Sequence, residues 1–413
     1  MYDRKTWIVL IVCGVLLALG MREQSKLAEQ RRLQQEKQRQ EQAAKAGGPA
    51  ASGTAAADNK PALVAEPPPP PAEEVIVKLE TPEVVFTFSN IGGGIKFAEF
   101  KNQLQVGDNS TPVRINDRGG APIGGIAGPD AKMENIAYTY DEAASVPGQK
   151  VVYVGRLDSG LLARKVFSLV TDGRPGSPYL LDLSLTLENP GTTPFGLKEW
   201  SLYAGTAVQQ HKDEFAHYIG AFWYQNNNMH FRHAGKFTKG FFSSAKSNID
   251  SDAGDPIQFA GVTDQFFSTV LRPEPPMAST VWSRPGHIPG KSVRAGLRFP
   301  DVALNPGDRR EFAYQVFIGP KHNPMLRKMG SGWGELMQYG GPVYDWLLVP
   351  IMARVLNWAL NSIHGLIDGF ANSWSWGLSI IILTILLRLA IWPLHSRSTR
   401  TMKRMAKLQP EMQ

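Results

Sequence analysis

One arginine inside an apolar run is the residue whose position has the clearest chemical consequence. Residues 376–394 read WGLSIIILTILLRLAIWPL, and Arg388 is their only charged side chain. As a helix this run extends roughly 27 Å, about one hydrocarbon core. A guanidinium there costs roughly 3 kcal/mol on insertion scales, so it persists only where water, a partner or an interface takes up its charge.

Thr384 lies four residues before Arg388, so the two side chains project from the same face of the helix. One interpretation is a polar functional site inside the membrane. The other is structural: the long arginine side chain reaches the near end of the helix, and the threonine hydroxyl bonds back to its own helix carbonyls. The spacing alone leaves both open.

A basic segment follows the apolar run. It is predicted to be helical, to begin at residue 395 and to lie in the cytoplasm, where it can contact lipid or client protein. Its five basic residues are Arg397, Arg400, Lys403, Arg404 and Lys407. The net charge of +7 comes from this segment and residues 22–46, so the large middle part is neutral and offers no basic platform for nucleic acid.

An amphipathic helix over 343–371 is predicted directly before the apolar run. Its polar side carries Arg354, Asn357, Asn361, His364 and Asp368, at spacings of three and four. We expect this helix to lie along the membrane interface. The alternative is a surface helix packed on the preceding domain.

The N-terminal part has two segments with different compositions. Residues 1–21 contain a short apolar run and are predicted to be an uncleaved signal anchor, with a cleaved signal peptide as the alternative. Residues 22–74 are charged and then rich in Ala and Pro, which is typical of a linker. With a cytoplasmic basic end, two spanning segments put the N-terminus in the cytoplasm and the middle of the chain outside.

Residues 75–321 alternate short runs of β-branched and aromatic residues with Gly- and Pro-rich turns. This pattern predicts one large antiparallel β-sandwich. The lone cysteine, Cys13, excludes an intrachain disulfide.

Motifs for metal, cofactor or enzyme chemistry are weak. His230 and His233 could share one helix face and bind zinc together with His211 or His217. We favour the alternative that all four are ordinary surface or loop histidines. The Gly-rich stretch 119–128 lacks a phosphate-loop pattern, and no serine-hydrolase elbow occurs. We therefore expect no cofactor, no metal and no catalytic residue.

Two further sets of side chains lie in the predicted β domain. The carboxylates Asp213, Glu214 and Asp264 have no spacing that singles out a pair. A set of aromatic residues could line a sugar groove, but core packing is favoured; its members are Trp200, Tyr203, Trp223 and Tyr224.

Several of these stretches together resemble the YidC family of membrane protein insertases in its Gram-negative form. The strongest match runs from Asn372 to Met412, and LNPGDRREFAYQVFIGPK, ending at Lys321, resembles the close of the periplasmic domain. The resemblance implies a galactose-mutarotase-like twisted sandwich without enzyme activity. It further implies a multi-pass inner membrane protein whose large domain is periplasmic.

The resemblance also implies a function. Arg388 and Thr384 would lie in a hydrophilic groove open to lipid, through which nascent membrane proteins enter the inner membrane. The Sec translocon, the ribosome and lipids would be partners. That family has further membrane helices after this point, so the chain is expected to be an N-terminal fragment. The rival functions are an anchored periplasmic scaffold that binds a glycan or protein, and a sugar-modifying enzyme.

Overall fold

The computed structural model describes residues 73–105, 110–211, 213–239, 244–246, 248–251, 255–338, 349–371 and 374–408. Side chains of the last segment are described to residue 393. The predicted signal anchor and all but the last two residues of the linker lie outside these ranges, as do residues 343–348 of the predicted amphipathic helix.

Two of the sheets hold most of the strands. A four-stranded antiparallel sheet has the order β1-β2-β3-β4, and a ten-stranded sheet has the order β13-β12-β15-β16-β21-β9-β8-β7-β6, with β17 paired to β15. The first sheet comprises β1 (Ile76–Glu80), β2 (Val84–Ser89), β3 (Gly94–Leu104) and β4 (Pro112–Ile115). The second comprises β6 (Thr139–Tyr140), β7 (Lys150–Arg156), β8 (Leu162–Leu169), β9 (Leu180–Glu188), β12 (Gly220–Gln225), β13 (Asn228–His233), β15 (Pro256–Thr263), β16 (Phe267–Glu274), β17 (Met277–Ala278) and β21 (Arg309–Pro320).

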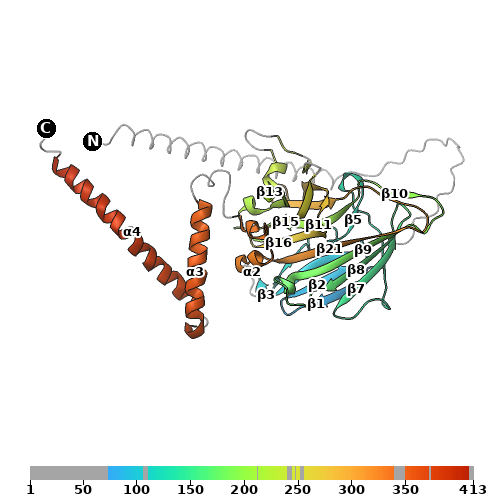
Figure 1. Cartoon of the computed structure of the whole chain (residues 1–413), viewed down its shortest axis with the longest axis horizontal. Helices are drawn as coiled ribbons and strands as arrows, with labels where there is room; N and C mark the ends of the chain where they lie inside the picture. Colours follow the sequence, from blue (N-terminus) through green and yellow to red (C-terminus); the bar gives the residue numbers. More distant parts are fainter. Residues whose placement is uncertain are drawn as a thin grey trace, which may run out of the picture. The chain divides into compact units, whose positions relative to one another are not determined.

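Two smaller sheets complete the β domain (Figure 1). A five-stranded sheet has the order β14-β18-β19-β11-β5, and β10 pairs with β20. These strands are β5 (Ile126–Ala127), β10 (Phe195–Leu197), β11 (Ser201–Val208), β14 (Ile249–Asp250), β18 (Thr280–Pro285), β19 (Ser292–Arg298) and β20 (Val302–Leu304). Short 3₁₀ turns lie between strands: η1 (Pro129–Ala131), η2 (Ser177–Tyr179), η3 (Ala216–Tyr218) and η4 (Ala234–Phe237).

The main core lies between these sheets. One hydrophobic cluster joins Phe88 of the four-stranded sheet, Leu183 of the ten-stranded sheet and Leu202 of the five-stranded sheet, all fully buried. Alternating side chains on each strand make this possible, because every second residue points inward. The predicted antiparallel β-sandwich is therefore confirmed.

The described residues after the last strand are mainly helical. They comprise α2 (Asn323–Lys328), η5 (Trp333–Met337), α3 (Val349–Ala371) and α4 (Ser375–Leu408). Leu326 and Trp333 close a second core cluster against Phe259 and Phe317 of the large sheet. The chain that leaves the sandwich thus stays packed on it at least as far as η5.

Two buried serines of the five-stranded sheet form a matched pair for testing core hydrogen bonds. Ser201 Oγ accepts a bond of 2.9 Å from the indole Nε1 of Trp282, whereas Ser283 Oγ is buried without a partner. We expect Ser201→Ala to destabilise the domain by about 1 to 2 kcal/mol, because it leaves a buried indole donor unpaired. Ser283→Ala should be neutral or stabilising. Chemical denaturation of the two variants measures the difference, and equal losses would contradict this account.

Candidate functional site

The apolar part of α4 carries the predicted intramembrane pair. In the part of the chain that the structure describes, Ser375–Pro393 is the one stretch long and apolar enough to cross a bilayer. Arg388 and Thr384 are both exposed on this helix. The Thr384 hydroxyl donates a hydrogen bond of 2.7 Å to the backbone oxygen of Ile380. The threonine thus makes the local bond that the structural interpretation expects, while the role of Arg388 stays a prediction.

The basic segment continues α4 without a break. The five basic positions from Arg397 to Lys407 lie on the helix, which ends at Leu408 and contains Pro393. Only the backbone is described for these five residues, so their contacts stay a prediction.

The α3–α4 hairpin is joined by polar and aromatic contacts. The His364 ring stacks on Trp376 with centroids 3.7 Å apart, and its Nε2 lies 3.1 Å from the Ser375 hydroxyl. On the same side of α3, Asn361 donates to Asn357, through a bond of 3.0 Å to its side-chain oxygen. Part of the polar side predicted from the sequence thus faces α4, through His364.

The opposite side of α3 is apolar and exposed. Ile351, Val355, Trp358 and Leu366 are each more than half exposed, with Leu366 at 77%. A row of this kind on a helix is the form that an interfacial membrane helix takes. Its position in the membrane remains a prediction.

A buried cluster of charged groups lies in the β domain. Asp264, at the turn before β16, is 3% exposed, and its Oδ1 accepts hydrogen bonds from the backbone nitrogens of Phe266 (2.8 Å) and Phe267 (2.6 Å). Glu214 is 6% exposed; its Oε2 accepts from the backbone nitrogen of Gln210 at 2.6 Å, but its Oε1 is buried without a partner. The Nζ of Lys321 is likewise buried without a hydrogen-bond acceptor.

Burial shifts the protonation of all three groups. It raises the pKa of Asp264 to about 7, and the nearby Glu214 raises it further against the effect of the backbone hydrogen bonds and Lys321. Burial also raises the pKa of Glu214. It lowers the pKa of Lys321 to about 8, while the two carboxylates oppose that shift. Two acids and one base therefore share one poorly solvated volume.

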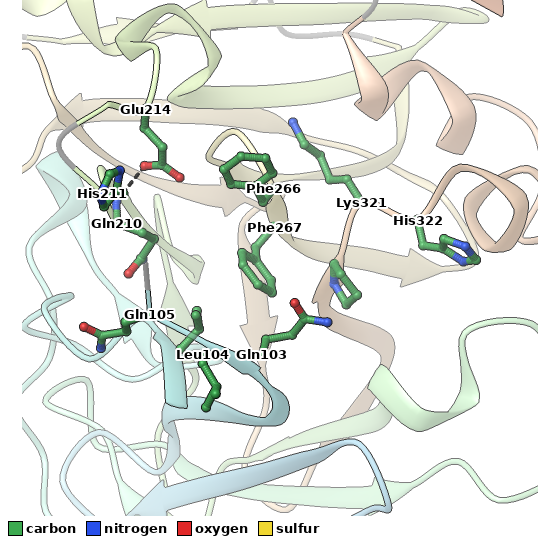
Figure 2. A pocket seen from close by; sticks show the side chains of 12 residues that line it. Gln103, Leu104, Gln105, Gln210, His211, Glu214, Phe266, Phe267, Lys321 and His322 are labelled. Atoms are coloured by element: carbon green, nitrogen blue, oxygen red, sulfur yellow. Dashed lines mark hydrogen bonds between the residues drawn. The ribbon is translucent and has the colours of Figure 1, made fainter. Parts of the chain in front are cut away.

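Two members of this cluster, Glu214 and Lys321, line a pocket of about 350 Å³ (Figure 2). Its walls come from the end of β3, the segment before η3, the start of β16 and the residues after β21. Apolar side chains line much of it, including Leu104, Phe266 and Phe267. Figure 2 shows the Glu214 carboxylate between His211 and Phe266.

A second buried base lies on β8. Lys165 is fully buried, and its Nζ donates to the carbonyl oxygens of Gly92 (2.8 Å) and Gly93 (3.1 Å). It also lies 4.4 Å from the centroid of the Tyr138 ring. Burial lowers the pKa of Lys165 to about 7, against the attraction of Glu134. These contacts hold the turn between β2 and β3 and make Lys165 a structural residue.

The predictions for histidines and aromatic residues have different outcomes. The possibility that His230 and His233 share a helix face is wrong. Both lie on strand β13, where side chains three positions apart point to opposite sides of the sheet. His230 stacks on Trp223. Among the described residues no group of three metal-ligating side chains occurs. Core packing is confirmed for the four aromatic residues, each at most 4% exposed: Trp200, Tyr203, Trp223 and Tyr224.

Reasoning from the sequence missed the buried charged cluster. The sequence gives no reason to pair Glu214 with Asp264, and Lys321 stands out in it only as the end of the stretch LNPGDRREFAYQVFIGPK. Fifty or more residues separate these positions along the chain. Only the fold brings them together. Lys165 did leave a signal: in LLARKVFSLV it alternates with Ala163 and Phe167, which places it on the inward face.

An antiparallel sandwich followed by an apolar helix of bilayer length defines the class of membrane-anchored β domains. The family described as YidC periplasmic domain matches residues 76–358, and the one described as 60Kd inner membrane protein matches residues 367–413. The chain therefore belongs to the YidC family.

Individual relatives agree with this assignment. The chain is 24% identical, over 352 residues, to a protein of Syntrophus aciditrophicus named membrane protein insertase YidC; the match covers 81% of this chain and 58% of that protein. The chain thus spans little more than half the length of this curated relative. The relatives carry the name of an insertase, which is not an enzyme, in agreement with the expectation.

Solved structures give weaker similarities. A galactose mutarotase-like protein of Lactobacillus casei has a TM-score of 0.38 and 12% identity, covering 59% of this chain and 100% of that one. A structure described as an active YidC insertase with its first transmembrane domain resolved has a TM-score of 0.25 and 15% identity, covering 83% of this chain and 60% of that one.

Proposed function

We propose that this chain is part of a membrane protein insertase that guides nascent membrane proteins into the inner membrane. The observation that carries the proposal is the family assignment, with its membrane-inserted part beginning in the stretch that holds Arg388. The chain spans only part of its relatives, so the activity is proposed for the complete gene product.

Arg388 and Thr384 supply one wall of a hydrophilic groove in this proposal. A fixed positive charge in a hydrated cavity lowers the free energy of moving polar backbone and acidic residues partway across the bilayer. The exposure of both side chains on α4 supports this role. The Thr384 hydroxyl bonds within its own helix, to the backbone oxygen of Ile380.

The remaining parts have roles consistent with this mechanism. The basic segment from Arg397 to Lys407 meets lipid, client protein and the ribosome on the cytoplasmic side. The exposed apolar side of α3 lies in the membrane interface. The N-terminus is cytoplasmic, the β domain is periplasmic, and the insertase acts alone or with the Sec translocon.

Substitution of Arg388 tests the groove. In the complete gene product we expect Arg388→Ala to lower insertion of at least one client with an acidic translocated segment severalfold, and Arg388→Lys to retain most of it, because the ammonium keeps the charge. Insertion is measured by protease protection of a radiolabelled client in membrane vesicles. Thr384→Ala should have a smaller effect. Unchanged insertion of every client tested in Arg388→Ala would refute the role of this residue.

Deleting the β domain separates the insertase from its rival. If residues from 325 onward of the complete gene product retain full client insertion, the β domain is not required for the activity. The same result would refute the periplasmic scaffold as the main role. A loss of insertion at normal membrane levels would instead show that the β domain contributes to insertion.

A further inference from the structure

The most exposed apolar side chains of the described β domain gather at one place. Phe215, Phe266 and Leu104 are 61%, 53% and 47% exposed. Phe266 and Leu104 line the pocket described above, and the backbone nitrogen of Phe215 bonds to the side chain of Gln265 beside it, at 3.0 Å. Such a concentration around a concavity is typical of a binding site.

The buried groups beside this pocket are unbalanced in charge. Glu214 and Asp264 provide two carboxylates, and Lys321 provides one ammonium. With all three ionised, one negative charge remains uncompensated in a poorly solvated place. In addition, Oε1 of Glu214 has no hydrogen-bond donor, although the residue is 6% exposed and lines the pocket. Leaving such an oxygen unpaired is unfavourable. Lys321 lines the same pocket and its Nζ is also buried without an acceptor, so it does not serve as the donor for Oε1 in this conformation.

We propose that this pocket binds a cationic group, a primary ammonium or a guanidinium, carried on an aliphatic stem. The head donates to Glu214 and supplies the missing positive charge, and a change of the Glu214 side-chain rotamer turns Oε1 toward it. The stem packs on Leu104 and on the exposed ring of Phe266, whose face also attracts the cation. A lysine or arginine side chain of a protein partner and a free alkylamine share this chemistry.

Binding is coupled to protons in this site. Without a ligand, a proton on Asp264 balances the charge near neutral pH, since burial raises the pKa of that carboxyl to about 7. A bound cation replaces this proton. The other titratable groups around the site are His211, Asp213, Tyr218 and His322.

Calorimetric titration of the full chain in detergent micelles tests the proposal, with pentylammonium chloride as the probe and 1-pentanol as a neutral probe with the same stem. We expect saturable binding of pentylammonium, at least tenfold tighter than pentanol. Repeating the titration at pH 7 in buffers with different ionisation heats should show proton release. Equal affinity for the two probes, or no saturable binding of pentylammonium, would overturn the proposal.

Two variants locate the site. Glu214→Gln keeps an acceptor for Gln210 and should weaken pentylammonium binding at least tenfold, while Glu142→Gln, an exposed carboxylate outside the pocket, should leave it unchanged. Should Glu214→Gln fail to fold, Phe266→Ala, which removes an exposed ring, should still weaken binding severalfold. Full affinity in both folded pocket variants would refute the assignment.

A lysine derivative distinguishes the two sources of the cation. If Nα-acetyl-lysine-N-methylamide binds at least as tightly as pentylammonium, the pocket accepts a side chain on a peptide, and the ligand is a protein partner. If only the small amine binds, the ligand is a free alkylamine. Both results support the cation site. Neither titration measures insertion of a client protein, so a failure of the cation site and a failure of the proposed insertase function can be told apart.

Discussion

Replacing Lys165 by alanine is expected to destabilise the β domain by about 3 to 5 kcal/mol, because it leaves two buried carbonyl oxygens without their donor and opens a cavity in the core. The Nζ of Lys165 is the donor for Gly92 and Gly93, which have positive φ angles of 76° and 55°. Without that donor, two carbonyl oxygens of a tight turn lose their partner inside the core. The deletion of a long buried side chain adds a cavity beside Tyr138.

Matched variants separate the two contributions. Lys165→Met keeps most of the side-chain volume and removes the donor, so its loss should be smaller than that of alanine. Lys198→Ala, at an exposed position, should change the free energy of unfolding by less than about 0.5 kcal/mol. Urea denaturation followed by tryptophan fluorescence measures all three. A loss below about 1 kcal/mol for Lys165→Ala would show that the turn does not need its donor.

Asp264→Asn is expected to stabilise the β domain at pH 8 by on the order of 2 to 4 kcal/mol, with little effect at pH 4. Asparagine retains an oxygen that accepts the bonds from Phe266 and Phe267, and it removes a buried carboxylate next to Glu214. The remaining Glu214 and Lys321 then balance each other in charge.

The direction with pH follows from proton binding. The pKa of Asp264 is about 7 in the folded chain and about 4 in an unfolded chain. The folded state therefore binds more protons between these values. The contribution of Asp264 to stability is fully present below about pH 4 and is lost as the pH rises through 7.

Denaturation at several pH values, from 4 to 8, compares the wild type with Asp264→Asn. The free energy of unfolding of the wild type should decline between pH 4 and 7, and this decline should be smaller in Asp264→Asn. The control Asp130→Asn should keep the full decline. Asp130 is exposed and has a positive φ of 57°, which asparagine tolerates. An Asp264→Asn variant less stable than the wild type at pH 8 would show that Lys321 needs that carboxylate more than Glu214 repels it.

How far the sequence predicts this protein depends on the range of the interactions. Alternation such as VVFTFS involves residues only two positions apart, so the sequence alone predicts the strands. It also predicts the burial of the aromatic residues Trp200 and Trp223. The HxxH spacing of His230 and His233 allows a shared helix face, because residues three apart lie on the same side of a helix. Strand β13, set by its pairing with β12, overrides it.

The candidate sites show the same division. Arg388 and Thr384 stand out because a charge in an apolar run is visible in one segment, although their role depends on surroundings that no local pattern contains. The approach of Lys321 to Glu214 and Asp264 depends on how the end of β21 meets the segment before η3 and the turn before β16. No spacing in the sequence records that geometry.

The unbroken α4 helix has a mechanical consequence. Its 34 residues form a rod about 51 Å long, roughly 20 Å longer than a hydrocarbon core is thick. Pro393 lies where the apolar portion meets the basic portion. A proline there donates no backbone hydrogen bond to the preceding turn, so the helix bends most easily at this point. A sideways force on the basic end is therefore expected to change the angle between the two portions before it moves the apolar one.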